Sequence, residues 1–217
     1  MSAVNSSVAL VTDISDNTGK ETARRLAKKG QTVVMGVRDL TTGQRLLQEL
    51  LTEEHAAELL VLDSRDPSSV SHAADTLLHR HGKLDVLINN HSIAMDKGPL
   101  SLAEPEDLIA TFETNIFGNF RCIRAFLPLL RKSSNPRVVN ISSSLGSVLN
   151  MTDKRSPYYE VTQPMYAASK AALNVLTIHL ARELKEEGIK INAVDPGIVD
   201  PRVPEIAMEH VMETAAN

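Results

Sequence analysis

Short apolar runs alternate with longer segments of helical pattern along most of the chain, and this alternation restricts its fold more than any other feature. Unbroken apolar runs bounded by turn residues are typical of strands that are buried on both faces of a sheet. Six runs are predicted as strands, namely Val8–Val11, Thr32–Val37, Glu58–Leu62, Leu84–Ile88, Arg137–Ile141 and Ile189–Val194. Such alternation predicts an α/β protein with a doubly wound parallel sheet and helices on both faces.

Helical periodicity fills the intervals between these runs. Helices are predicted at Gly19–Lys29, Thr41–His55, Pro67–His81, Glu104–Leu130 and Met165–Glu187, and a shorter one at Val203–Ala216. A chain of 217 residues is long enough for one domain with its own core, so residues 1–217 are expected to form a single domain. No apolar run follows Pro196-Gly197, so we expect the sheet to lack a seventh strand.

Polar side chains gather where the predicted strands end. They are Thr12-Asp13, Arg38-Asp39, Asp63, Asn89-Asn90, Ser142-Ser143-Ser144 and Asp195. Right-handed crossovers bring the carboxyl ends of parallel strands to one edge of the sheet, where doubly wound folds bind their ligands. The sequence therefore predicts a ligand site along this edge.

Composition excludes several classes of partner. The formal net charge is −4, aromatic residues make up 3% of the chain and tryptophan is absent, which argues against nucleic acid and anionic membranes. No stretch approaches the ~20 apolar residues of a membrane span, and the first residues do not resemble a signal peptide. The single cysteine, Cys122, cannot form an intramolecular disulfide, so we expect a reducing, cytoplasmic location. No metal site is predicted.

Tyr166 and Lys170 are the first candidate catalytic pair. Residues four apart lie on the same face of a helix, so the ammonium group would lie near the phenol. A nearby cation favours phenolate and would lower the phenol pKa from about 10. Such a tyrosine can exchange a proton with a substrate oxygen near neutral pH. The alternative is a half-buried tyrosine on an amphipathic helix beside a solvated lysine.

With these elements in order, the chain resembles the short-chain dehydrogenase/reductase family from about residue 8 to residue 201. The stretch 33–39 and Gly43-Gln44 are similar to its carbonyl-reductase-like branch. The resemblance implies a Rossmann-type fold in which Tyr166 is the acid/base and Lys170 also holds the nicotinamide ribose. It further implies that Ser143 binds the substrate carbonyl and that Asn115 holds a proton-relay water.

The resemblance is weakest at the phosphate-binding turn. The family pattern Thr-Gly-x-x-x-Gly-x-Gly stands here as residues 12–19, and only the last glycine, Gly19, is retained. Asp13 and Asn17 replace the other two, and Asp16 adds a second carboxylate. A carboxylate close to a phosphate costs on the order of 1–4 kcal/mol. Asn17 tolerates a positive φ better than most residues. The alternative is that this loop is an ordinary helix N-cap region.

Other cofactor positions are mixed. By resemblance, Arg38 binds the 2′-phosphate of NADP and Asp63 the adenine amino group, although each could be an ordinary surface or turn residue. The Asn-Asn-Ala-Gly of the family becomes 89–92, in which His91 either titrates or fills vacated space. Pro201 replaces a threonine that contacts the carboxamide. The predicted cofactor-binding set is Asp13, Asn17, Thr18, Gly19, Arg38, Asp63, Asn90, Lys170, Pro196 and Gly197.

Three functions follow from this sequence. The first is NADP(H)-dependent reduction of a ketone or aldehyde, which makes a small carbonyl compound the substrate. The second is a non-redox enzyme on the same fold, catalysing cyclisation, dehydration or isomerisation without a nicotinamide cofactor. The third is a catalytically silent binding or scaffold protein. The stretch 151–160 is either an insertion that shapes the substrate pocket or a solvent loop. Homo-oligomers are possible.

Overall fold

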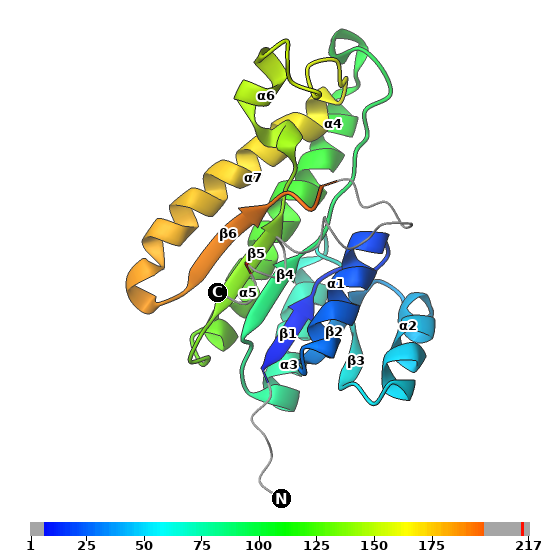
Figure 1. Cartoon of the computed structure of the whole chain (residues 1–217), viewed down its shortest axis with the longest axis vertical. Coiled ribbons are helices and arrows are strands. Elements are labelled where there is room, and N and C mark those ends of the chain that lie inside the picture. Colours follow the sequence, from blue (N-terminus) through cyan, green and yellow to red (C-terminus); the bar gives the residue numbers. More distant parts are fainter. Residues whose placement is uncertain (1–6, 198–213, 215–217) are drawn as a thin grey trace, which may run out of the picture.

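The computed structural model describes residues 7–197 and residue 214. Six parallel strands form one sheet in the order β3-β2-β1-β4-β5-β6, as Figure 1 shows. The strands are β1 (Val8–Val11), β2 (Thr32–Val37), β3 (Ala57–Val61), β4 (Val86–Asn89), β5 (Arg137–Ile141) and β6 (Lys190–Val194). The predicted α/β class and doubly wound sheet are therefore confirmed.

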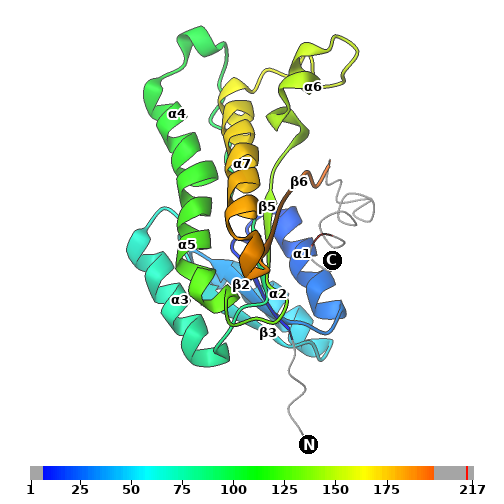
Figure 2. The ribbon, with the colours of Figure 1, turned by 90° about the vertical axis from the view of Figure 1, so that its left-hand side faces the viewer.

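Helices cover both faces of this sheet. The α-helices are α1 (Asn17–Lys28), α2 (Leu40–Thr52), α3 (Pro67–His81), α4 (Pro105–Phe112), α5 (Asn119–Leu130), α6 (Val148–Thr152) and α7 (Pro164–Glu183). Figure 2 shows α1 and α2 on one side, and α3, α5 and α7 on the other. Two buried clusters match these layers, one between the sheet and α3 and α5, the other between the sheet and α1 and α2.

The central strand β1 explains why the strand sequences lack polar alternation. Leu10 faces the α3–α5 layer, its neighbour Val11 faces the α1–α2 layer, and both are fully buried. Leu10 is also paired in register with Val34 of β2 and Leu87 of β4. Burying such a side chain contributes about 1.5–3 kcal/mol. A strand between two helical layers therefore needs apolar residues at every position.

Several predicted elements have the expected bounds, and others differ for identifiable reasons. β1, β2, β5 and α3 were predicted correctly to the residue, and the other strands within two residues. α1 and α2 begin earlier than predicted because Asp16 and Asp39 cap them, accepting hydrogen bonds from Gly19 N (2.8 Å) and Thr41 N (3.0 Å). Part of the stretch 151–160 is helical, since α6 ends at Thr152. The helix predicted at 203–216 lies outside the described residues apart from residue 214, and Pro201 lies outside them too.

The helix predicted at Glu104–Leu130 is found at 105–130, but it is not α-helical throughout. The structure instead has α4, a π-helical segment at Glu113–Gly118 and then α5. The segment at Met165–Glu187 also divides, into α7 and a 3₁₀ turn at Lys185–Glu187. A π turn takes one extra residue and is frequent at functional sites, but sequence periodicity does not reveal it. None of the helices in the described part of the chain is both long and apolar enough to span a membrane.

Candidate active site

Lys170 is buried beneath Tyr166 in the first half of α7. Its Nζ atom donates a hydrogen bond to the carbonyl oxygen of Ile141 at 2.7 Å, at the end of β5. The same atom lies 5.4 Å from the centre of the Tyr166 ring. Burial lowers the pKa of Lys170 to about 8, although Asp16 and Asp195 act in the opposite direction. The lysine is therefore a sequestered cation, and the alternative of a solvated lysine is wrong.

The expected lowering of the Tyr166 pKa is not found. Burial raises the pKa of this phenol above its ordinary value of 10, and the charges of Asp195 and Asp16 raise it further. Hydrogen bonding with the Ser92 and Ser143 side chains opposes this rise without reversing it. The physical reason is burial, which disfavours the charged phenolate more than the two serine hydroxyls favour it. Near neutral pH, Tyr166 is therefore protonated and able to donate.

Ser143 reaches Tyr166 from the turn that follows β5. Its Oγ atom accepts a hydrogen bond from Leu145 N at 3.2 Å, which starts a 3₁₀ turn. Asp195, just after β6, holds the same turn by accepting from Ser144 N at 2.8 Å and from the Ser144 hydroxyl. The ends of β5 and β6 thus hold the turn with Ser143 and Ser144 beside Tyr166.

Asn115 lies fully buried in the π-helical segment and ties two elements of the site together. Its Nδ2 atom donates to Ile93 O at 2.8 Å and to Ser169 Oγ at 2.9 Å, while its Oδ1 atom accepts from Ile93 N at 2.8 Å. Both amide hydrogens are therefore used to join the loop after β4 to α7. Its backbone oxygen accepts from Asn119 Nδ2 at 2.7 Å. The predicted part of Asn115 in holding a relay water stays a prediction.

In the turn before α1, the carboxylates of Asp13 and Asp16 accept hydrogen bonds from the backbone of the turn, and Asp16 also accepts one from Asn90. Asp16 Oδ1 accepts from Gly19 N and from Asn90 Nδ2, at 2.8 and 2.9 Å. Asn90 Nδ2 also donates to the carbonyl oxygen of Asp13, whose side chain accepts from Ser15 N at 2.8 Å. A Cβ atom at Gly19 would lie 2.1 Å from that carbonyl oxygen, so this position requires glycine. The alternative of a helix N-cap is therefore confirmed, whereas phosphate binding by this loop stays a prediction.

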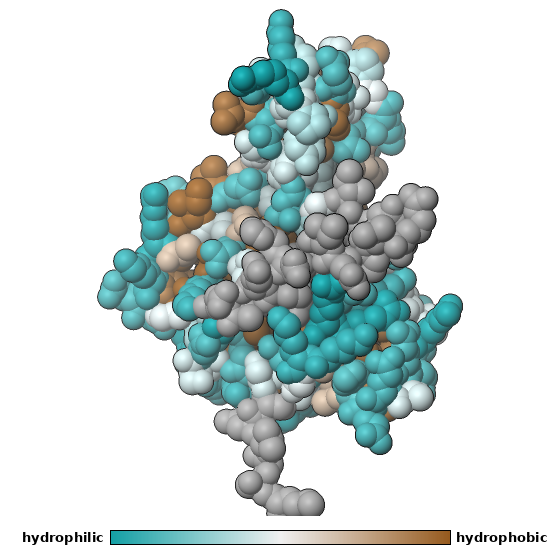
Figure 3. Space-filling model, viewed as in Figure 1, coloured by the Kyte–Doolittle hydropathy of each residue, from teal (hydrophilic) through white to brown (hydrophobic). Residues whose placement is uncertain are grey.

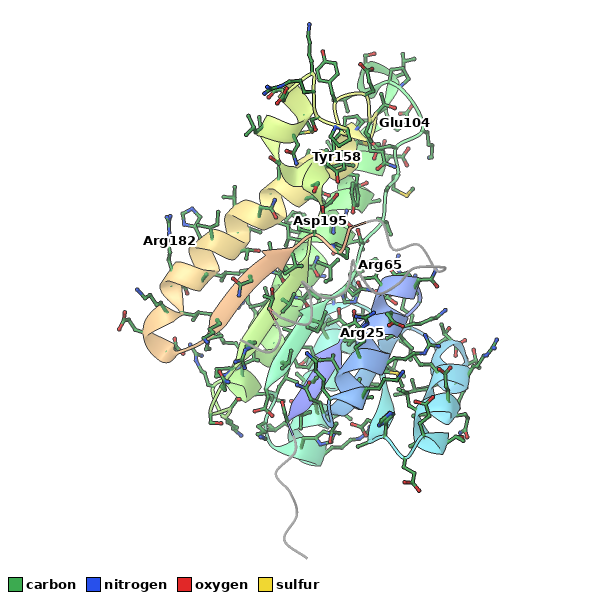
Figure 4. All side chains as sticks on the ribbon, in the orientation of Figure 1. Arg25, Arg65, Glu104, Tyr158, Arg182 and Asp195 are labelled. Atoms are coloured by element: carbon green, nitrogen blue, oxygen red, sulfur yellow. The ribbon has the colours of Figure 1, made fainter. Side chains whose placement is uncertain are left out.

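Two adjoining hollows lie along this edge of the sheet and share Ser92 and Ile93. The larger has a volume of about 410 Å³, and among its lining residues are the predicted positions Thr18, Asn90, Tyr166, Lys170, Pro196 and Gly197. The smaller, about 130 Å³, is lined by residues that include Asp13, Arg38, Asp63, Arg65 and His91. Figure 4 shows Asp195 beyond the end of β6, and Arg65 nearer to α1. The structure thus divides most of the predicted residues between two adjoining hollows. Four of them line neither, namely Asn17, Gly19, Asn115 and Ser143, and Ser143 instead lines another hollow of about 650 Å³ together with Asp195.

The charges around the smaller hollow differ from the sequence expectation. Asp63 is paired with Arg65, with 2.8 Å between Oδ2 and Nη2 and 3.1 Å between Oδ1 and Nε. This pairing lowers the pKa of Asp63 and occupies much of the carboxylate that was expected to meet adenine. Arg38 is exposed and has no ion-pair partner within the described part of the chain. Arg65 was not predicted from the sequence as a partner of Asp63, although the two residues are only two positions apart in the chain.

His91 is buried between the sheet end and the smaller hollow. Its Nδ1 atom lies 2.9 Å from Thr12 Oγ1, and burial lowers its pKa to about 4. The ring is therefore neutral near neutral pH, which argues against a titrating role there. Among the described residues, no group of three His, Cys, Asp or Glu side chains is arranged to hold a metal ion.

Asp96 was not singled out from the sequence, but it supports the start of α7. Its two carboxylate oxygens accept from Met165 N at 2.9 Å and Tyr166 N at 3.1 Å. The local N-cap residue, Gln163, forms no side-chain capping bond. A carboxylate at a helix N-terminus is favoured by the helix dipole. The loop after β4 thus anchors the backbone of the candidate catalytic tyrosine.

Comparisons with known proteins agree with this geometry. A family model described as short chain dehydrogenase matches residues 7–210. The 3-oxoacyl-(acyl-carrier-protein) reductase FabG of Thermotoga maritima is 30% identical over 208 residues, which cover 96% of this chain and 80% of that protein. The short-chain dehydrogenase anuI of Penicillium roqueforti is 32% identical over 205 residues, covering 91% and 80%.

Solved structures show the same relationship. A metagenomic short-chain oxidoreductase in complex with NADP has a TM-score of 0.81 and 28% identity, with 97% of this chain and 92% of that chain covered. A gluconate 5-dehydrogenase from Burkholderia cenocepacia, in complex with NADP and tartrate, has a TM-score of 0.76 and 27% identity, with 93% and 76% covered. The fold, the Tyr166–Lys170 pair and the matching family model together show that this chain belongs to the short-chain dehydrogenase family.

Proposed function

We propose that this chain is an oxidoreductase that reduces a ketone or aldehyde with NADPH. The observation that carries the proposal is a protonated Tyr166 that interacts with Ser143 directly above the buried ammonium of Lys170. The nicotinamide cofactor would supply the hydride to the carbonyl carbon. The protein must then orient the carbonyl oxygen and deliver one proton to it.

The side chains divide this work. Ser143 donates to the carbonyl oxygen and fixes its position beside the tyrosine. Tyr166 transfers its proton to that oxygen as negative charge develops there. Lys170, whose Nζ lies 5.4 Å from the ring centre, stabilises the resulting phenolate. Burial keeps Tyr166 protonated near neutral pH, which is the state in which it can act as the acid.

The two hollows fit a dinucleotide cofactor. Tyr166 and Lys170 line the larger one, and Arg38 lines the smaller one at the other side of Ser92. The unpaired guanidinium of Arg38 suits a 2′-phosphate, because arginine matches phosphate oxygens with two parallel hydrogen bonds. Relatives of known structure that hold NADP also support this assignment. We therefore propose NADP rather than NAD as the cofactor.

The test is oxidation of NADPH in the presence of a panel of ketones and aldehydes, followed by its absorbance. Tyr166→Phe is expected to lower kcat by about 10²–10⁴-fold, the usual contribution of a general acid. Ser143→Ala is expected to reduce kcat as well, whereas the control Ser101→Ala, on an exposed turn, is expected to leave it unchanged. Full activity of Tyr166→Phe would refute the mechanism.

One observation favours a second candidate, a non-redox enzyme. The Asp16 carboxylate accepts the hydrogen bond of Gly19 N at the start of α1, where by resemblance a cofactor phosphate would be expected to accept it. Asp16 also lines the larger hollow, so it adds a negative charge there. Calorimetry with NADPH separates the two candidates. Binding supports the oxidoreductase, while no heat at millimolar NADPH, together with Tyr166-dependent turnover of some carbonyl compound, supports the non-redox enzyme.

A further inference from the structure

His91 has one ring nitrogen with a partner and one without. The side chain is 6% exposed, and Nδ1 lies 2.9 Å from Thr12 Oγ1. The other nitrogen, Nε2, is buried and forms no hydrogen bond within the described residues. Leaving a buried polar group without a partner is unfavourable, so this nitrogen requires an explanation.

The hydrogen bonds of Thr12 indicate which nitrogen of the His91 ring carries the hydrogen. Thr12 Oγ1 already accepts a hydrogen bond from Asn90 N at 3.1 Å, so its own hydrogen needs an acceptor. Nδ1 of His91 is the other partner that this hydroxyl has, and it must therefore accept. Because the neutral imidazole carries a single N–H, that hydrogen is on Nε2. The nitrogen without a partner is thus a donor.

The position of the ring relates this donor to the smaller hollow. His91 lines that hollow together with Arg38 and Asp63, whereas Thr12 does not. Because Nδ1 is directed at Thr12, we infer that the ring edge with Nε2 is the one on the side of the hollow. Arg38 and Arg65, which pairs with Asp63, also line the hollow, so acceptor atoms of a ligand would meet cationic donors beside His91.

We propose that Nε2–H of His91 is a binding group for the adenosine half of the dinucleotide, donating to a base nitrogen or ribose oxygen. The inference rests on the proposed function, because it requires a nucleotide in the smaller hollow. The alanine that the family pattern has at this position offers no such donor. His91 therefore adds a specific contact with the nucleotide beside the turn at residues 12–19, which has only one of the three family glycines. This contact strengthens binding of the nucleotide.

The binding test uses adenosine 2′,5′-bisphosphate, which lacks the nicotinamide and so probes the adenosine half alone. Two variants separate the ring nitrogens, because an Asn amide reaches the place of Nδ1 and a Gln amide that of Nε2. Calorimetry is expected to show about tenfold weaker binding by His91→Asn, equivalent to the loss of one net hydrogen bond. His91→Gln is expected to bind within about threefold of the unaltered protein.

Three outcomes overturn the proposal: equal affinity in all proteins, equal weakening in both variants, or no binding by the unaltered protein. A second readout needs no variant. In protein with ¹⁵N-labelled histidine, the Nε2–H resonance of His91 is expected to shift when the bisphosphate is added, and an unchanged resonance at saturation would mean that the hydrogen serves a buried water instead. Ligand binding that depends on His91 without NADPH oxidation would refute the proposed function alone.

Discussion

Replacing Asp96 tests whether the loop after β4 sets the position of the catalytic helix. Asp96→Ala removes two hydrogen bonds to the backbone of α7, from Met165 N and Tyr166 N. Loss of a capping side chain costs about 0.5–2 kcal/mol. Loss of the negative charge at the helix N-terminus adds about 0.3–1 kcal/mol. Together they predict a decrease of about 1–3 kcal/mol in the free energy of unfolding.

Urea unfolding followed by circular dichroism measures this change. Asp96→Asn keeps an acceptor oxygen and loses the charge, so its decrease is expected to be smaller. Asp153→Ala is the matched control, since that carboxylate pairs with the exposed Arg155 on the surface, and no measurable change is expected. Because Tyr166 N is one of the two donors, Asp96→Ala should also lower kcat. Stability of Asp96→Ala within about 0.3 kcal/mol of the unaltered protein would refute the reasoning, since the cap would then contribute less than the weakest known caps.

Three further predictions concern the turn before α1 and the charges of the site. Gly19→Ala should prevent folding or lower the melting temperature sharply, because its Cβ atom would meet a loop carbonyl at 2.1 Å, whereas Gly98→Ala, in open space, should melt normally. Burial lowers the pKa of Lys170 from 10.5 to about 8, so between these values the unfolded state binds more protons. The contribution of Lys170 to stability should therefore rise with pH across that window, by at most about 3 kcal/mol, whereas buried Cys122 and Tyr166, whose pKa values are raised, act in the opposite direction. Urea titrations of Lys170→Met should lack the Lys170 contribution, which is the difference between the two pH profiles. Asp195→Asn removes a charge that raises the pKa of Tyr166, so the phenolate absorbance should appear at lower pH, and an unchanged titration would contradict the assigned cause.

The parts of the fold that depend on local pattern were predictable from the sequence. Val8–Val11 is an apolar run that a sheet covered on both faces requires, Arg137–Ile141 is mostly apolar, and α3 begins at Pro67 after its cap, Asp66. Helix starts were less well predicted where a capping residue was taken as part of a loop. The edge of the sheet that carries the site followed from topology alone. The surface over α1 and α2 is dominated by hydrophilic residues, as Figure 3 shows.

The parts that depend on long-range contacts were not predictable. The spacing of Tyr166 and Lys170 identified the pair, but the direction of the Tyr166 pKa depends on burial, which the spacing does not contain. Asp96 and Tyr166 are 70 residues apart, so no local motif connects them. The hydrogen-bond partner of His91 likewise comes from another strand end, 79 residues away. Local pattern thus gives the residue types of the site, and tertiary structure gives their protonation.

The π-helical segment at Glu113–Gly118 places one residue more than an α-helical turn would hold within a helix that runs from α4 to α5. Deleting one residue there would allow an ordinary α-helix from α4 through α5, in which each backbone N–H bonds the carbonyl four residues back instead of five. Side chains within the segment would then take new positions around the helix axis, and Asn115 would leave the place where it bonds Ile93 and Ser169. The chain length of this segment is therefore as specific a requirement as its asparagine, and a single-residue deletion would undo the site without altering any of its side chains.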